Sequence, residues 1–234
     1  MSTNLEQLKH ELEVFQVCDS TFPIGSFNHS YGMETYLREG VMDNEDSFLE
    51  WLITYLHTQF KYSEALGIRL AWQALENEDI EALWYYDRVL TVSSVAQETR
   101  DGAKMIAKQM IKMVMALFDI PWLDVYKQRI EEKKSFGHPA IVFALFAHHQ
   151  KLDEAASIMF YGYSILSTMV QNAVRAIPIG QQPGQIVLKK TLSELENVTK
   201  SVDLLDASDL GANMPGMELA QMKHEVQAFR LFMS

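Results

Sequence analysis

The stretch Ala155–Ile177, AASIMFYGYSILSTMVQNAVRAI, indicates how the chain folds. No charged residue occurs between Ala155 and Val174, and the apolar positions recur with the period of a helix, about 3.6 residues. A run of about twenty apolar residues would also span a bilayer. Here serine, threonine and amide side chains interrupt the run, and no second span accompanies it. We therefore expect a central apolar helix of a bundle over about residues 155–177 and no membrane span.

The rest of the chain is also predicted to be helical. Its 11 glycines and 6 prolines lie mostly between periodic segments, and no run alternates apolar and polar residues. We predict an all-α protein with a single domain over residues 1–234, which forms one helical bundle of about nine or ten helices. The other helices are expected over about residues 5–15, 33–37, 45–75 with a possible break near Gly67, 79–90, 94–117, 122–133, from 139 onward, 188–205 and 217–228.

The overall charge restricts the classes of partner. A net charge of −11 argues against a nucleic-acid-binding protein, which needs a basic face to displace counterions, and against docking on an anionic membrane. A single cysteine excludes an internal disulfide framework and is typical of a reducing compartment. The polar N-terminal residues show no secretory signal. We expect a cytoplasmic protein.

The segment of residues 19–34, DSTFPIGSFNHSYGME, differs from the helical pattern. Pro23 restricts the residue before it to an extended conformation, and Gly25 permits a left-handed turn. Ser26 or Asn28 is expected to cap the helix that follows. The segment carries more apolar side chains than a surface loop needs. It is therefore predicted either to plug its own core or to dock on a partner.

No motif predicts an active site. The chain has no phosphate-binding glycine motif, and its seven histidines include no pair at the i, i+4 spacing of a helical metal site. His29 is read as a hydrogen-bonded structural residue, with a metal ligand as the alternative. Asp19, Ser20, Ser26 and His29 supply the residue types of a serine triad, but the nucleophile-elbow motif is absent. We therefore predict no catalytic residue, no bound cofactor and no metal site.

The last residues form an apolar tail, 229–234, FRLFMS. An apolar tail is expected to pack on its own domain or on a partner, because water solvates it poorly. Glu34 lies four residues before Arg38, which is the spacing of a surface ion pair on a helix. Glu34 is therefore read either as a member of that pair or as part of a partner-binding site.

Four stretches together resemble the urease accessory protein F (UreF) family. They are the segment from Asp19 to Glu34, the helix start Gly137-His138-Pro139, the run 176–181 with Gly184-Gln185, and the C-terminal stretches 222–225 and 229–234. The resemblance implies an all-α homodimer without catalytic chemistry that acts in maturation of the nickel enzyme urease. It implies binding to accessory protein D (called H in some systems) and recruitment and modulation of accessory protein G, a GTPase. The assembly would deliver nickel to the urease apoprotein.

The resemblance also implies which residues bind partners. They are Phe22, Pro23, Gly25, Ser26, Phe27, His29, Ser30, Glu34, His224, Glu225, Phe229, Arg230 and Phe232. In the family the tail becomes ordered near the segment 19–34 when the D/H partner binds. Arg230 is then expected to bond to carbonyls of that segment, while the partner buries Phe229 and Phe232. Position 27 is often tyrosine or phenylalanine and position 226 often arginine in the family. With Phe27 this chain has no hydroxyl at that position, and Val226 removes part of the polar network of the tail.

Two other functions remain open from the residues. An all-helical enzyme of the heme-oxygenase or thiaminase type would suit the length and the helix content, with Cys18 or His29 as nucleophile or ligand. A helical scaffold for an unrelated complex would suit the acidic, methionine-rich surface.

Overall fold

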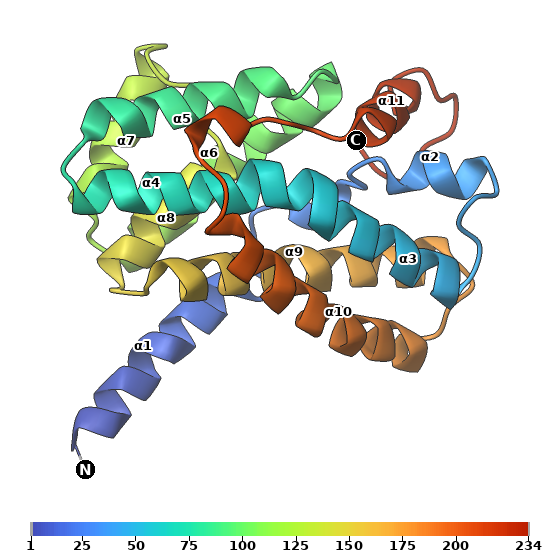
Figure 1. The fold of residues 1–234 in the computed structure, drawn as a ribbon, viewed down its shortest axis with the longest axis horizontal. Helices are drawn as coiled ribbons and strands as arrows, with labels where there is room; N and C mark the ends of the chain where they lie inside the picture. Colours follow the sequence, from blue (N-terminus) through green and yellow to red (C-terminus); the bar gives the residue numbers. More distant parts are fainter. Residues whose placement is uncertain (1, 234) are drawn as a thin grey trace.

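All regular secondary structure in the described part of the chain, residues 2–233 of the computed structural model, is helical (Figure 1), which confirms the all-α prediction. Met1, the first residue of the predicted domain, and Ser234, the last residue of the predicted domain and of the tail, lie outside this part. The α-helices are α1 (Ser2–Cys18), α2 (Met33–Arg38), α3 (Glu45–Tyr55), α4 (Leu66–Glu76), α5 (Ile80–Ser93), α6 (Gln97–Leu117), α7 (Pro121–Glu131), α8 (Pro139–His149), α9 (Glu154–Ala176), α10 (Gln181–Val202) and α11 (Pro215–His224). Two short 3₁₀ helices, η1 (Ser26–Asn28) and η3 (Ala207–Asp209), and a π-helix, η2 (Leu56–Ala65), complete the secondary structure of these residues.

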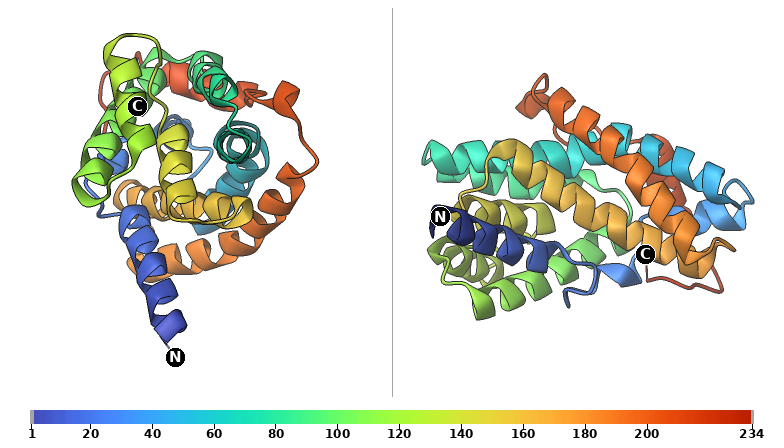
Figure 2. Two further views of the ribbon diagram at one scale, coloured as in Figure 1. Left: turned by 90° about the vertical axis from the view of Figure 1, so that its left-hand side faces the viewer. Right: turned by 90° about the horizontal axis from the view of Figure 1, so that it is seen from below.

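Helix α9 occupies the central position that the sequence predicted. It packs against α1, α4, α8 and α10 and also contacts η1 and η2. Helix α8 is the more completely buried of the two, since every residue from Pro139 to Ala147 is shielded from solvent. The end-on view in Figure 2 shows α8 enclosed by other helices. The core therefore has two inner helices, of which the sequence indicated one.

The expected long helix over residues 45–75 forms without a break at Gly67. Helices α3 and α4 are joined end to end through the π-helix η2. Asn44 caps the start of α3, because its Oδ1 accepts hydrogen bonds from the backbone nitrogens of Asp46 and Ser47, both at 3.0 Å. Gly67 lies against α5: a Cβ atom at this position would lie 2.8 Å from Cδ1 of Leu90. The glycine is thus explained by close helix packing.

A buried carboxylate holds the connection between α7 and α8. Asp87 of α5 accepts hydrogen bonds from the hydroxyl of Tyr126, at 2.6 Å, and from the backbone nitrogens of Phe136 and Gly137, at 2.7 and 3.2 Å. The same tyrosine hydroxyl accepts a bond from the backbone nitrogen of His138. These bonds fix the start of α8, where Nδ1 of His138 caps the first turn by accepting the backbone N–H of Ala140.

Helix α1 extends away from the bundle as an arm (Figure 1). Its contact with the bundle is made by its last turns, where Val14, Val17 and Cys18 are buried. Four large apolar side chains of this helix point to solvent; they are Leu5, Leu8, Leu12 and Phe15, with 45–72% of their surface exposed. Within residues 2–233, no helix combines the length and the apolarity that crossing a membrane requires.

Candidate interaction site

The segment of residues 19–34, called the signature segment below, follows a path set by two glycines. Gly25 adopts the predicted left-handed conformation, with φ of 85°, and precedes η1. Gly32, with φ of 89°, stands at the N-cap of α2. The expected cap from Ser26 or Asn28 does not form, because α2 begins only at Met33 and no side chain caps it. Left-handed turns of this kind favour glycine, which lacks a Cβ atom.

The signature segment plugs its own core. Phe22, His29, Ser30 and Glu34 are buried. The His29 ring covers Gly102 of α6, where a Cβ atom would lie 2.7 Å from the ring atom Cε1. Burial lowers the pKa of His29, and its backbone oxygen accepts a hydrogen bond from Asn172 at 2.9 Å. This geometry favours the structural interpretation of His29.

The described part of the tail lies beside the signature segment. The carboxylate of Glu34 accepts the backbone N–H groups of Leu231, at 2.8 Å on Oε1, and of Phe232, at 3.1 Å on Oε2. The backbone nitrogen of Met233 donates to the carbonyl oxygen of Asn28 at 2.7 Å. The tail is thus held by the chain's own residues.

His224, at the end of α11, joins the same network. Its Nε2 lies 3.0 Å from Oε2 of Glu34, and its Nδ1 lies 3.2 Å from Oε2 of Glu98. Glu98 also pairs with Arg230 of the tail, and its backbone N–H donates to Glu225. Desolvation opposes ionisation of Glu98, but the hydrogen bonds and charges of Arg230 and His224 outweigh it and lower the pKa of the carboxyl. The carboxylates therefore link helices α2, α6 and α11 to the tail.

In the single chain the Arg230 side chain pairs with Glu98 and not with carbonyls of the signature segment, and the bonds expected in the presence of the partner stay a prediction. Arg175 of α9 takes this role. Its Nη2 donates to the carbonyl oxygen of Phe27 at 2.7 Å, and its guanidinium lies 5.8 Å from the Phe27 ring centre and 5.4 Å from that of Phe232. Sequence reasoning missed Arg175. It is the one charged residue in the stretch 155–177, and that isolated charge was the available signal.

The predicted partner-binding residues divide into two groups by exposure. Buried in the chain itself are Phe22, His29, Ser30, Glu34, His224 and Phe232. Exposed or partly exposed are Pro23, Gly25, Ser26, Phe27, Glu225, Phe229 and Arg230. Apolar neighbours extend the second group. We define the exposed tail face as Phe27, Val226, Phe229, Leu231 and Met233, whose exposed fractions run from 46% to 85%.

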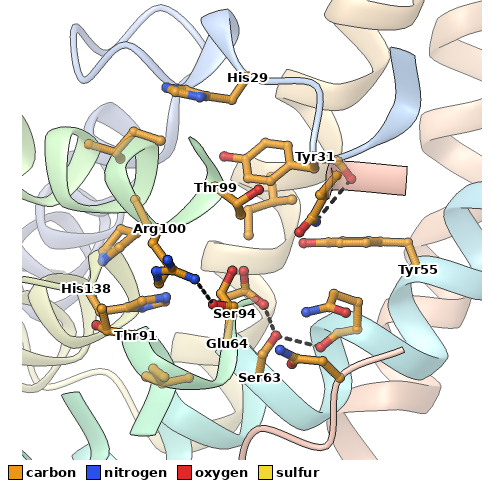
Figure 3. Close-up of a pocket in the computed structure, with 18 of the residues that line it drawn as sticks. His29, Tyr31, Tyr55, Ser63, Glu64, Thr91, Ser94, Thr99, Arg100 and His138 are labelled. Atoms are coloured by element: carbon orange, nitrogen blue, oxygen red, sulfur yellow. Dashed lines mark hydrogen bonds between the residues drawn. The ribbon is translucent and has the colours of Figure 1, made fainter. Parts of the chain in front are cut away.

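An enclosed cavity of about 70 Å³ lies beneath the signature segment (Figure 3). Tyr31 of the segment, Tyr55, Glu64 and Arg100 contribute to its wall. Burial raises the pKa of Glu64, which accepts a hydrogen bond from Ser63. Sites for drug-sized ligands typically measure about 300–1,000 Å³. This cavity is therefore too small for haem or thiamin.

Cys18 is also a poor candidate nucleophile. Its side chain is 1% exposed, and desolvation raises the pKa of the thiol far above its usual value, so the reactive thiolate is disfavoured. Among residues 2–233, no group of three or more histidine, cysteine or acidic side chains is placed to hold a metal ion.

Comparisons with known proteins agree with the motifs. A family model for UreF matches residues 42–191. The urease accessory protein UreF of Streptococcus thermophilus (strain ATCC BAA-491 / LMD-9) is 55% identical over 227 residues, which cover 97% of this chain and 96% of that protein. The same figures hold for UreF of Streptococcus salivarius (strain 57.I). UreF of Bacillus sp. (strain TB-90) is 44% identical over 223 residues, or 95% of this chain and 98% of that protein. The chain therefore belongs to the UreF family of urease accessory proteins.

Proposed function

We propose that this protein is a non-catalytic chaperone that scaffolds the accessory complex for nickel delivery to the urease apoprotein. It binds accessory protein D/H through the exposed tail face, and the complex recruits and modulates the GTPase accessory protein G. Nickel is the cargo of this assembly. Family membership supports the role in urease maturation, and the assignment of each partner follows the resemblance of the sequence motifs.

The exposed tail face is the observation that carries the proposal. Phe229 is 81% exposed and Leu231 is 72% exposed, although the backbone N–H groups of Leu231 and Phe232 are hydrogen-bonded to Glu34. Large apolar side chains that point to solvent beside a hydrogen-bonded backbone are suited to act as anchors, which a partner buries on binding. Polar groups of Glu225 and Arg230 border these anchors, as is typical of the rim of an interface.

The body of the protein is proposed to act as a homodimer in the cytoplasm. Two copies in one complex would present two tail faces, each of which binds one D/H partner. The size of the complex therefore tests the dimer and the tail face together. A complex with two copies exceeds a complex with one copy by the 26.8 kDa of one chain and by the mass of the second D/H partner.

A pull-down with purified partner D/H tests the proposal. The double variant Phe229→Ala, Leu231→Ala removes two anchors and leaves the backbone bonds to Glu34 in place. We expect an unchanged melting temperature and at least a tenfold loss of affinity, since a buried anchor contributes about 2 kcal/mol or more. Leu204→Ala is the matched control, because Leu204 is 87% exposed and lies in the connection after α10.

Light scattering on the purified complex then counts the chains. A complex with two copies of this protein, weakened by the double variant and unaffected by Leu204→Ala, supports the scaffold. Undiminished binding by a folded double variant would contradict the assignment of the tail face.

A further inference from the structure

Polar side chains without a protein partner gather around the enclosed cavity beneath the signature segment. Four buried side-chain atoms of its lining residues have no hydrogen-bond partner within the described chain; they are Oη of Tyr55, Oγ of Ser94, Oδ1 of Asn213 and Oε1 of Gln221. Tyr55 is 1% exposed and Gln221 is 6% exposed. In Figure 3 the hydroxyl of Tyr55 points into the space that the lining residues enclose. The cavity therefore collects polar atoms that other described side chains leave unpaired.

Unpaired polar atoms of this kind are costly. A buried polar group without a hydrogen bond has lost its interactions with water and gains none in return. Native proteins therefore contain few such groups, and groups that surround a polar cavity are commonly bonded to buried water. Four of them in one cavity would take up a large part of the small net stability of a domain. The lining residues thus indicate an occupant that forms hydrogen bonds.

The chemistry of the cavity wall restricts this occupant. The two amide oxygens accept hydrogen bonds only, whereas the two hydroxyls can donate or accept. Arg100 faces the cavity from the side opposite Tyr55 (Figure 3), and its Nη1 donates to the carbonyl oxygen of Ser94 at 2.7 Å. A cation would meet this guanidinium, and an anion would meet the amide oxygens and the carboxyl group of Glu64. Water both donates and accepts, so it suits all of these groups.

The size of the cavity also fits water. Its volume of about 70 Å³ gives room for about two water molecules, since each takes about 30 Å³ in the liquid. A buried water typically makes about three hydrogen bonds. Two waters that bond to each other can therefore form about four bonds to the wall, which equals the number of unpaired atoms there.

The wall is built from parts of the chain that lie far apart in the sequence. Tyr55 ends α3, and Glu64 belongs to the π-helix η2, a rare form that occurs frequently at functional sites. Ser94 follows α5, and Gln221 lies in α11. Tyr31 of the signature segment also lines the cavity, and its left-handed φ of 55° is unusual for an aromatic residue. Water in the cavity therefore bridges several helices and the signature segment.

We propose that this cavity is a binding site for a cluster of about two ordered water molecules, which bond to Tyr55, Ser94, Asn213 and Gln221. The cluster supplies the polar contacts beneath the signature segment that these side chains do not make with one another. The site lies in the body of the protein and is independent of the proposed function.

A crystal structure of the full-length protein tests the site directly. We expect density for ordered water within hydrogen-bond distance of Oη of Tyr55 and of the amide oxygen of Asn213 or Gln221. An empty cavity in a map that shows ordered water elsewhere would overturn the proposal. Density for an ion or for a larger molecule in the cavity would also overturn it.

Tyr55→Phe tests the site in solution, because the sign of its effect differs between a hydrated and a dry cavity. The variant removes Oη and keeps the ring that stacks on Trp51. If water bonds to the hydroxyl, its removal should lower the folding equilibrium constant about two- to tenfold. In a dry cavity the same change removes an unpaired polar group and should raise that constant about fivefold or more. Urea unfolding measures the constant.

Ser94→Ala repeats this test with a smaller change in volume and serves if Tyr55→Phe does not fold. Tyr85→Phe is the matched control, because Tyr85 is 57% exposed and does not line the cavity, so its stability should not change. Lower stability of Tyr55→Phe and of Ser94→Ala, with an unchanged control, supports the water cluster. Higher stability of both variants would contradict it.

Discussion

Asp87, Glu34 and His138 are buried polar residues, and each fixes a connection between helices. Asp87 holds the start of α8 through backbone N–H groups, and Glu34 holds the tail in the same way. An unpaired buried polar group costs about 1–3 kcal/mol, so each of these side chains favours the one arrangement that satisfies it. At this scale the polar residues determine the connections, while the apolar residues supply most of the stability.

His138 makes the fold sensitive to acid. Burial lowers its pKa to about 4, and Nδ1 must stay unprotonated to accept the N–H of Ala140. In the unfolded chain the pKa is about 6.5, so the unfolded state binds the proton first as the pH falls. Stability from this group is complete above about pH 6.5 and declines by about 3 kcal/mol toward pH 4.

Urea unfolding between pH 7 and pH 4 measures this decline. His138→Asn keeps a side-chain acceptor at the N-cap and does not titrate, so its stability should vary less with pH. The same pH dependence in both proteins would show that other groups cause the acid sensitivity.

Local residue roles were predictable from the sequence, and distant pairings were not. The turn at Gly25 and the cap at Asn44 depend on neighbouring residues, which a sequence displays directly. Arg175 and the carbonyl of Phe27 are 148 positions apart, and Arg230 and Glu98 are 132 apart. No local pattern specifies such partners, so the contact between Arg230 and Glu98 in the single chain could not be predicted from the sequence.

At the scale of elements, hydrophobic periodicity located the helices but not all of their ends. Helix α11 ends at His224, although the pattern continued to about residue 228, because the chain turns there so that the tail can reach Glu34. The possible break near Gly67 does not form, and this glycine lies inside a continuous helix. Glycine in a helix costs about 1 kcal/mol relative to alanine, and close packing of α4 on Leu90 explains why it is present.

Gly102 of α6 has the same kind of role beneath the signature segment. In Gly102→Ala the added Cβ would lie 2.7 Å from Cε1 and 2.9 Å from Nδ1 of His29. The His29 backbone is tied to Asn172, so the ring cannot move freely. Although alanine favours the helix, we expect a net destabilisation of about 1–3 kcal/mol and looser packing of the signature segment. Urea unfolding measures the stability, and hydrogen exchange of residues 27–30 measures the local effect.

Gly216→Ala is the matched control for this prediction. Gly216 is also helical, but its added Cβ would approach other atoms only to 3.5 Å, an ordinary contact. This variant should be neutral or slightly stabilising. Equal stability of the two variants would contradict a tight contact between α6 and His29.

At the scale of the whole molecule, the described chain combines a compact bundle with two apolar surfaces outside its core. The exposed tail face lies beside the signature segment, and exposed apolar residues also occur along α1, which extends from the bundle as an arm in Figure 1. The family model covers residues 42–191, so both surfaces lie outside the matched region. The fold class followed from periodicity. Contacts between distant segments decide which helices pack together, and they make α8 the most buried helix of the described chain. Periodicity alone does not predict these contacts.

The arm α1 should contribute little to the stability of the bundle. Residues 5–12 are all exposed, and Val14, Val17 and Cys18 make the buried contact. We therefore expect that deletion of residues 2–9 changes the melting temperature by less than about 2 °C, because the removed side chains that are described cover no core surface.

Val17→Asp, at a position 2% exposed, should instead destabilise the protein by about 3 kcal/mol or more, since it buries an unpaired charge. Calorimetry of the deletion, the substitution and the full chain distinguishes the two effects. A loss of several degrees on deletion would mean that the leucines of α1 cover the body of the protein in solution.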